Sequence, residues 1–296
     1  MPEPLESRGP TADREGGPRL ADSMIRALRA ARTAGYRLLD PVDRLARRAA
    51  RKDELPPLSL RRHAGPVKAF ESSTAALFGL LAWKGLLGEG TRLLDVGCGP
   101  GAVPLRIERE RVTIRSYVGV DVHEPSIRWC RNRFAGRGSF RFELARIRSP
   151  YGLADAADPA GYRFPADDGA ADLVLAKSLF THLLDETARN YMAEIRRCLS
   201  PDGFGVLTAF VFDGTKGPPA AFPHHGADPG IRWRRRLHPH AAVAYDRRLF
   251  ETMILGSGLE VSEMLPGFWP GLSRALRGQD TYVVRRAGPG AAEANR

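Results

Sequence analysis

The stretch "LLDVGCGPGAVPL", residues 93–105, joins two apolar runs through an acid, three glycines and a proline. Residues 91–96 have the composition of a buried strand, and a helix is predicted from Gly101. Glycine adopts backbone conformations that other residues avoid, and it lets a ligand approach the main chain. A helix that begins directly after such a turn presents unpaired N–H groups. The stretch therefore predicts a ligand site between a strand and a helix.

Strands and helices alternate along the rest of the chain. Helices are predicted from Gly101 and over residues 124–134, 185–200 and 246–258. Repeated strand–helix units imply a mostly parallel sheet with helices on both faces. We therefore predict an α/β fold with a doubly wound sheet. Its seven strands are expected at residues 91–96, 116–122, 139–144, 171–177, 204–212, 259–265 and 280–286.

The segments before and after this alternation differ in composition. Residues 1–20 lack the apolar stretch of a signal peptide and are predicted to be a disordered tail. Residues 21–60 are predicted to form a basic, amphipathic helical extension that Pro41 interrupts. The main domain is expected over residues 61–286, followed by a second disordered tail at residues 287–296.

An insertion over residues 212–244 separates the fifth strand from the next helix and contains five prolines. It follows the carboxyl end of a strand, where open α/β sheets bind ligands. We therefore expect it to form a mobile lid that is part of the site. Its histidines show no recognised metal-ligand spacing, so we expect a solvent-exposed loop and no metal site. These histidines are His224, His225, His238 and His240.

The chain is basic, with 45 Lys and Arg residues against 34 Asp and Glu residues and a formal net charge of +11. No nucleic-acid-binding motif accompanies the charge, so no nucleic-acid partner is predicted. The open interpretations are an Arg-rich surface, an anionic substrate, or peripheral contact of the basic N-terminal helices with an anionic membrane. No apolar run approaches the roughly 20 residues that span a bilayer. Three cysteines without a CxxC pair fit a cytoplasmic protein better than a zinc site.

An acid follows the glycine turn at a distance that suggests a nucleoside site. Asp121 ends the second strand 20 residues after Gly101, and an acid at this place commonly accepts hydrogen bonds from ribose hydroxyls. Two cofactor classes share this geometry, because residues 97–102 also satisfy the loose GxGxxG/A dinucleotide fingerprint. Asp95 separates them, since a carboxylate there suits the ammonium group of a ligand and is unfavourable beside a pyrophosphate.

Four blocks of the chain resemble the class I S-adenosylmethionine-dependent methyltransferases. They are "LLDVGCGPG" (93–101), "YVGVDV" (117–122), "RFPADDGAADLVLAKSLFTHLL" (163–184) and "EIRRCLSPDGFGVLTAF" (194–210). The resemblance extends over about residues 57–286 and implies a Rossmann-like fold with S-adenosylmethionine as cofactor. "LPPLSLRRHAGP" (55–66) and "GQDTYVVRR" (278–286) resemble a bacterial branch associated with glycan or natural-product modification.

The resemblance also implies which residues hold the cofactor. The first acid and the glycines would hold its methionine end, Asp121 would bind the ribose hydroxyls, and Val122 would lie beside the adenine. The main chain near Lys177 would close the pocket. The implied cofactor-binding residues are Asp95, Gly97, Cys98, Gly99, Gly101, Asp121, Val122 and Lys177.

One position departs from the family pattern. After the third strand the family usually has an acid that accepts a hydrogen bond from the adenine amine, whereas this chain has Ala145-Arg146. Arginine cannot accept a hydrogen bond. Either Glu143 or a main-chain carbonyl replaces the missing acid, or cofactor binding is weaker.

His182 is the candidate catalytic residue. It follows the fourth strand, at the edge of the sheet where the resemblance places the sulfonium. Histidine accepts a proton near neutral pH, so it suits the removal of a hydroxyl proton from an acceptor. The alternative is a structural histidine bonded to the backbone at the start of a helix, with Thr181 as the N-cap.

The sequence thus predicts a metal-independent methyltransferase that acts on a small molecule or a glycan, with oxygen favoured as the methylated atom. Arg234, Arg235 and Arg236 either bind an anionic group of the acceptor or form a solvated basic run. Trp269 either stacks on the acceptor or anchors the core. Two other functions stay open: a nicotinamide-dependent oxidoreductase, and a non-catalytic adenosylmethionine-binding relative, which Arg146 suggests.

Overall fold

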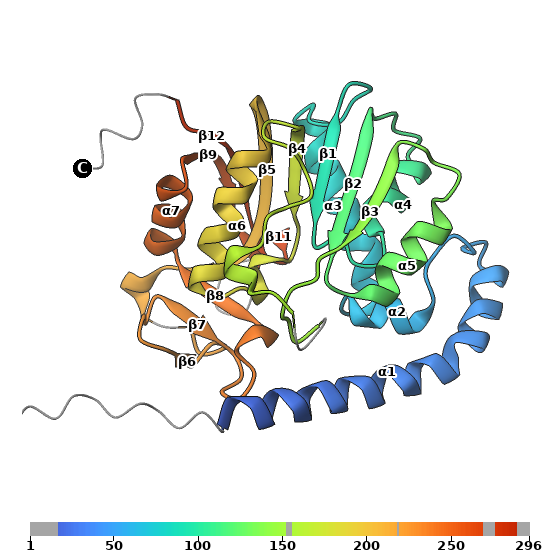
Figure 1. Ribbon diagram of the computed structural model, residues 1–296, viewed down its shortest axis with the longest axis horizontal. Helices are drawn as coiled ribbons and strands as arrows, with labels where there is room; N and C mark the ends of the chain where they lie inside the picture. The colour runs from blue at the N-terminus through green and yellow to red at the C-terminus, as the bar shows by residue number, and fades with distance from the viewer. Residues whose placement is uncertain (1–16, 152–155, 218, 269–275, 289–296) are drawn as a thin grey trace, which may run out of the picture.

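The computed structural model describes residues 17–151, 156–217, 219–268 and 276–288 (Figure 1). The prediction for Trp269 and most of the two predicted tails, residues 1–20 and 287–296, lie outside these ranges, but residues 17–20 are helical, so the first tail was predicted too long. Within them, no helix combines the length and the apolar composition needed to cross a membrane.

A twisted sheet forms the centre of the molecule (Figure 1). Its main strands are β1 (Arg92–Val96), β2 (Ser116–Asp121), β3 (Phe140–Leu144), β4 (Ala171–Ala176), β5 (Leu199–Phe212), β9 (Leu259–Leu265) and β12 (Asp280–Arg286). The first five are parallel, in the order β3-β2-β1-β4-β5. Strand β12 lies antiparallel to both β5 and β9. The predicted α/β fold with a doubly wound, mostly parallel sheet is confirmed.

Three further strands make this a ten-stranded sheet, so the predicted count of seven is wrong. They are β6 (His224–His225) and β7 (Ile231–Trp233), which lie in the insertion, and β8 (Val243–Asp246), which begins in it. Strand β5 is 14 residues long and extends past the end of β4. Its last residues, from Phe210 to Phe212, pair with β8. The backbone groups of this protruding end are satisfied by the insertion, which is therefore part of the sheet.

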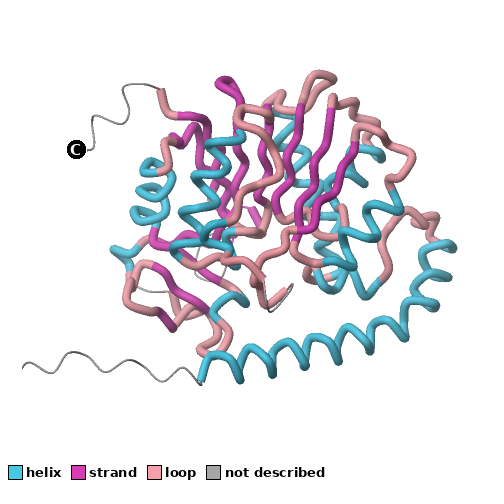
Figure 2. Tube along the Cα trace, in the orientation of Figure 1, coloured by secondary structure: helices cyan, strands magenta, loops and turns pink. Residues whose placement is uncertain are grey.

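Helices cover both faces of the sheet (Figure 2). They are α1 (Gly17–Ala49), α2 (Leu58–His63), α3 (Val67–Trp83), α4 (Ala102–Arg109), α5 (Glu124–Arg133), α6 (Asp185–Cys198) and α7 (Arg247–Gly256). The remaining short elements are the 3-10 helices η1 (Pro159–Gly161), η2 (Phe180–His182), η3 (Gly214–Lys216) and η4 (Pro239–Ala241), and the strand pair β10 (Gly267–Phe268) and β11 (Leu276–Arg277).

Successive residues of each strand point to opposite faces, and each face has its own core. Leu94 and Val174 pack with α6 and α7 in one cluster, while Leu93 and Leu173 pack with α3, α4 and α5 in the other. One face of α6 is buried in the first cluster. Its residues are Ala188, Tyr191, Met192 and Ile195, followed by Leu199 at the start of β5.

The helical extension is more continuous than expected. Helix α1 runs unbroken for 33 residues from Gly17, so the interruption predicted at Pro41 is wrong. A proline inside a helix removes one main-chain hydrogen bond. The neighbouring turn is fixed from outside, because Asp40 accepts hydrogen bonds from the N–H and hydroxyl of Ser59, and Asp43 accepts one from the N–H of Leu58. These contacts with α2 fix the turns around the proline, and the helix continues through it as a curved helix (Figure 1).

Candidate active site

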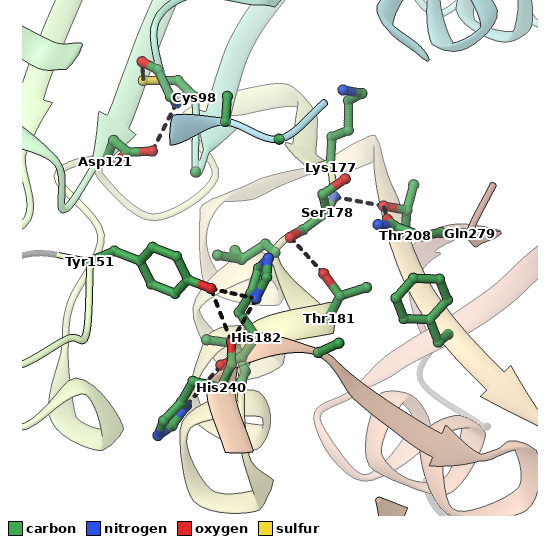
Figure 3. A pocket seen from close by; sticks show the side chains of 18 of the residues that line it. Cys98, Asp121, Tyr151, Lys177, Ser178, Thr181, His182, Thr208, His240 and Gln279 are labelled. Atoms are coloured by element: carbon green, nitrogen blue, oxygen red, sulfur yellow. Dashed lines mark hydrogen bonds between the residues drawn. The ribbon is translucent and has the colours of Figure 1, made fainter. Parts of the chain in front are cut away.

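The turn between β1 and α4 consists of glycines in the left-handed region of the backbone. Gly97, Gly99 and Gly101 have φ angles of +80°, +52° and +77°, which residues with a side chain rarely adopt. Asp121 holds this turn from the end of β2 (Figure 3). Its Oδ2 accepts a 2.8 Å hydrogen bond from Gly99 N–H, and its Oδ1 accepts a 2.7 Å bond from His123 N–H. The structure therefore brings the predicted turn and the predicted acid into direct contact.

A cavity of about 2820 Å³ lies at the carboxyl edge of the sheet. Small-molecule sites typically enclose about 300–1000 Å³, so this one has room for two ligands. All the sequence-predicted site residues line it except Gly101: Asp95, Gly97, Cys98, Gly99, Asp121, Val122, Lys177 and His182. Gly101 faces α5 instead, where an added Cβ would lie 3.0 Å from Cys130 Sγ.

Two opposite charges are buried in this cavity. Asp95 is 1% exposed, and its Oδ2 accepts a 2.6 Å hydrogen bond from the Tyr117 hydroxyl. Burial raises the pKa of Asp95 to about 6, although the Tyr117 hydrogen bond and the charge of Lys177 act in the opposite direction. Burial lowers the pKa of Lys177, and attraction to Asp95 raises it. Sequence reasoning assigned only the main chain of Lys177 and missed its buried ammonium group.

His182 is held by main-chain carbonyls. Its Nδ1 lies 2.8 Å from the carbonyl oxygen of His240, and Nδ1 of His240 lies 2.9 Å from the carbonyl oxygen of His182 (Figure 3). A carbonyl oxygen only accepts hydrogen bonds, so Nδ1 of the neutral His182 ring carries the proton and Nε2 is the basic nitrogen. The Tyr151 hydroxyl lies 3.1 Å from the same Nδ1 and donates to the His240 carbonyl.

No pattern in the sequence indicated that these three side chains lie together. His240 is part of the cavity wall and His238 is buried, so the prediction of a solvent-exposed loop is wrong for both. Fifty-eight residues separate His182 from His240, and their contact depends on β8 pairing with the end of β5. Tyr151 lies on the loop after β3 and was not considered a site residue.

The alternative for His182, a histidine bonded to the backbone with Thr181 as N-cap, holds only for the bond to the backbone. Thr181 is not an N-cap, because its hydroxyl donates to the Ser178 carbonyl and α6 begins only at Asp185. Ser178 has a φ of +57°, and its N–H donates a 2.6 Å hydrogen bond to Oγ1 of Thr208. This strained turn ends β4 and separates the direction of Lys177 from that of His182 (Figure 3).

Neither Arg146 nor Glu143 supplies an acid at the end of the cavity near Val122. Arg146 is exposed, Glu143 pairs with Arg131 and Arg141, and neither Arg146 nor Glu143 lines the cavity. Glu143 therefore does not replace the missing acid.

A stacked pair of histidines lies near this end of the cavity. The ring of His63, from α2, lines the cavity and stacks on His123 with centroids 3.5 Å apart. Burial and the charge of Arg37 lower the pKa of His123 to about 4. His123 is consequently neutral at physiological pH and able to stack without charge repulsion.

The insertion supplies the cavity wall opposite the glycine turn. Arg234 and Arg236 line the cavity, whereas Arg235 does not. The Arg234 guanidinium lies 5.2 Å from the centre of the Phe222 ring, which is fully buried. In the described ranges, no group of three or more His, Cys, Asp or Glu residues is arranged to hold a metal ion.

Comparison with known proteins identifies the domain. Residues 94–207 match the family model described as "Methyltransferase domain". Residues 94–207 are thus similar to a methyltransferase domain over somewhat more than a third of the chain. Nocamycin O-methyltransferase from Saccharothrix syringae is 38% identical over 122 residues, which are 40% of this chain and 38% of that protein. The similarity therefore spans well under half of the relative's length.

One of two similar solved structures supports the fold. A SAM-dependent methyltransferase from Methanosarcina mazei superposes with a TM-score of 0.50 at 15% identity, covering 70% of this chain and 97% of that one. Geranyl diphosphate C-methyltransferase from Streptomyces coelicolor A3(2) superposes with a TM-score of 0.48 at 16% identity, covering 66% of this chain and 60% of that one. Because the identity to the Methanosarcina mazei protein is only 15%, that superposition supports the fold and not a particular function.

The hydrogen bond to His240 predicts the tautomer of His182. We expect the Nδ1–H form near neutral pH, because Nδ1 must donate to the carbonyl oxygen. Long-range proton–nitrogen correlation spectra of histidine-labelled protein distinguish the two tautomers, and the His182→Gln variant assigns the signal. An Nε2–H pattern for that signal would contradict the geometry.

Proposed function

We propose that this protein is an S-adenosylmethionine-dependent O-methyltransferase whose acceptor is a small molecule or glycan with an anionic group. The observation that carries the proposal is the carbonyl-bound ring of His182, which leaves Nε2 as a base at the same sheet edge as the glycine turn. Oxygen is favoured because a hydroxyl needs such a base near neutral pH. The similarity to a protein named as an O-methyltransferase supports the same choice.

The residues present fit the cofactor. S-adenosylmethionine, when bound, supplies a methyl group on a positively charged sulfur. Gly99 leaves space beside the main chain, since a Cβ added there would meet only the Cβ of Ala64, at 4.0 Å, whereas a Cβ added at Gly97 would lie 3.3 Å from Cδ1 of Leu179. The Asp95 carboxylate would bind the ammonium of the methionine end. Asp121 would bind the ribose, because a carboxylate accepts about four hydrogen bonds and the main chain uses two.

The chain's own groups then perform the acid–base step. Nε2 of His182 would accept the hydroxyl proton of the acceptor. The resulting imidazolium would be stabilised by its Nδ1–H bond to the His240 carbonyl, which also fixes the ring orientation. Tyr151 donates to the same carbonyl and contacts the ring edge on, with centroids 5.2 Å apart. Both neighbours act by positioning His182.

The acceptor would occupy the part of the cavity that the insertion borders. Arg234 and Arg236 supply guanidinium groups there, and guanidinium binds carboxylate and phosphate through paired hydrogen bonds. Leu237 and Ala242 of the same segment add apolar surface. An acceptor with one apolar region and one anionic group matches this wall.

Replacing His182 tests the base. His182→Gln keeps a donor for the His240 carbonyl but removes the basic nitrogen, and we expect kcat to fall by about 10²- to 10⁴-fold. Affinity for S-adenosylhomocysteine should stay unchanged. The assay follows S-adenosylhomocysteine release with a panel of hydroxylated carboxylates and phosphates. His225→Gln, an exposed position in β6, is the matched control. A His182→Gln enzyme with wild-type kcat would remove the proposed role.

The arginine run allows an internal comparison. The Arg234→Ala/Arg236→Ala double variant removes both cavity-lining guanidiniums, and we expect KM for the acceptor to rise roughly 10- to 100-fold, as for lost hydrogen bonds between charged groups. Arg235→Ala, which changes a neighbour outside the cavity lining, should leave KM unchanged. If the double variant and Arg235→Ala had the same KM for the acceptor, the three arginines would be solvated surface and would not bind the acceptor.

A further inference from the structure

Helix α1 packs on the domain through its polar side. Its partly buried residues recur every three or four positions, at Tyr36, Asp40, Asp43 and Arg47. Asp43 is paired with Arg61 of α2 and, at 2.8 Å, with Nε of Arg47 in its own helix. The Arg62 guanidinium lies over the Tyr36 ring, 5.1 Å from its centre. The helix is therefore attached to the domain by ion pairs and hydrogen bonds. An amphipathic helix usually packs its apolar side on the protein, whereas α1 packs its polar side.

The opposite side of α1 is apolar and faces solvent. Six of the nine exposed large hydrophobic side chains in the described ranges belong to this helix. They are Met24 (66% exposed), Leu28 (69%), Leu38 (82%), Leu39 (49%), Val42 (65%) and Leu45 (66%). At 3.6 residues per turn these positions form one stripe along the helix. An exposed apolar stripe of this kind usually marks a surface that binds a membrane or another protein.

From Met24 onward, the exposed charged side chains that the structure describes on α1 are all positive. Between Met24 and Ala49 the helix has only two acids, Asp40 and Asp43, and both are bonded to α2. The exposed arginines are Arg32, Arg37, Arg44 and Arg48. A second copy of this helix would bring like charges together, whereas an anionic lipid surface would attract them. The charge pattern therefore selects the lipid surface as the occupant.

We propose that α1 binds the surface of an anionic phospholipid bilayer. The leucine and valine side chains would enter the boundary between headgroups and acyl chains, and Arg32, next to the stripe, would contact lipid phosphates, while the other exposed arginines would add to the attraction of the anionic surface. Because the polar side of α1 is fixed to α2, and His63 of α2 lines the cavity, binding would hold the cavity in one orientation relative to the membrane. This inference is independent of the reaction that the domain catalyses.

Vesicle sedimentation of the full chain tests the proposal. We expect the protein to pellet with phosphatidylcholine vesicles that contain phosphatidylglycerol, and to stay in solution with phosphatidylcholine alone. Binding should weaken as salt rises, because the screening length falls below about 10 Å above 0.1 M. The Leu38→Glu/Val42→Glu variant should lower the partition coefficient at least about tenfold, since charged side chains cannot enter the apolar boundary. Leu255→Glu, at a 44% exposed leucine on α7, should bind like wild type.

Two outcomes would overturn the proposal. One is equal pelleting of wild type and the Leu38→Glu/Val42→Glu variant, or no pelleting of wild type at low salt. The other is a wild-type dimer in light scattering that this variant converts to a monomer, which would make the stripe a contact between copies. Thermal unfolding and S-adenosylhomocysteine binding should match wild type in both variants, because the replaced side chains are exposed.

Discussion

The carboxylate of Asp121 joins the two turns on which the whole site depends. Its bond to Gly99 N–H fixes the glycine turn after β1, and its bond to His123 N–H fixes the turn after β2. Burial raises the pKa of Asp121, and these main-chain donors oppose the rise. The turn conformation is thus set by the protein itself before a ligand arrives, which lowers the ordering cost of binding.

The second half of the site depends on a contact between distant segments. The reciprocal bonds between His182 and His240 join the turn after β4 to the insertion. Tyr245 in β8 reinforces the link, because its buried hydroxyl donates to the carbonyls of Phe180 and Leu183. The insertion therefore orients the candidate base as well as enclosing the cavity. The glycine turn and the insertion approach the cavity from opposite sides, which suits a cofactor on one side and an acceptor on the other.

Local patterns in the sequence predicted most of the fold, since strand composition, helix periodicity and the glycine turn all depend on near neighbours. These local patterns did not predict the parts of the structure that depend on contacts between residues far apart in the sequence. Strands β6 to β8 have two to four residues each and form because β5 protrudes beyond β4. Tyr151 and His240 join the site only through that pairing. Proline propensity alone suggested a break at Pro41, whereas Asp40 and Asp43 are held by α2 on both sides of it.

The central claim is that Asp95 and the glycine turn bind the amino-acid end of S-adenosylmethionine. The most direct test is calorimetric titration with S-adenosylhomocysteine between pH 5 and 8, for wild type and Asp95→Asn. With a pKa of about 6, Asp95 is charged above that pH and protonated below it. The account predicts that wild-type affinity falls up to about tenfold per pH unit below pH 6 and that the Asp95→Asn profile is flat. Identical profiles, or wild-type protein that binds NAD instead, would contradict it.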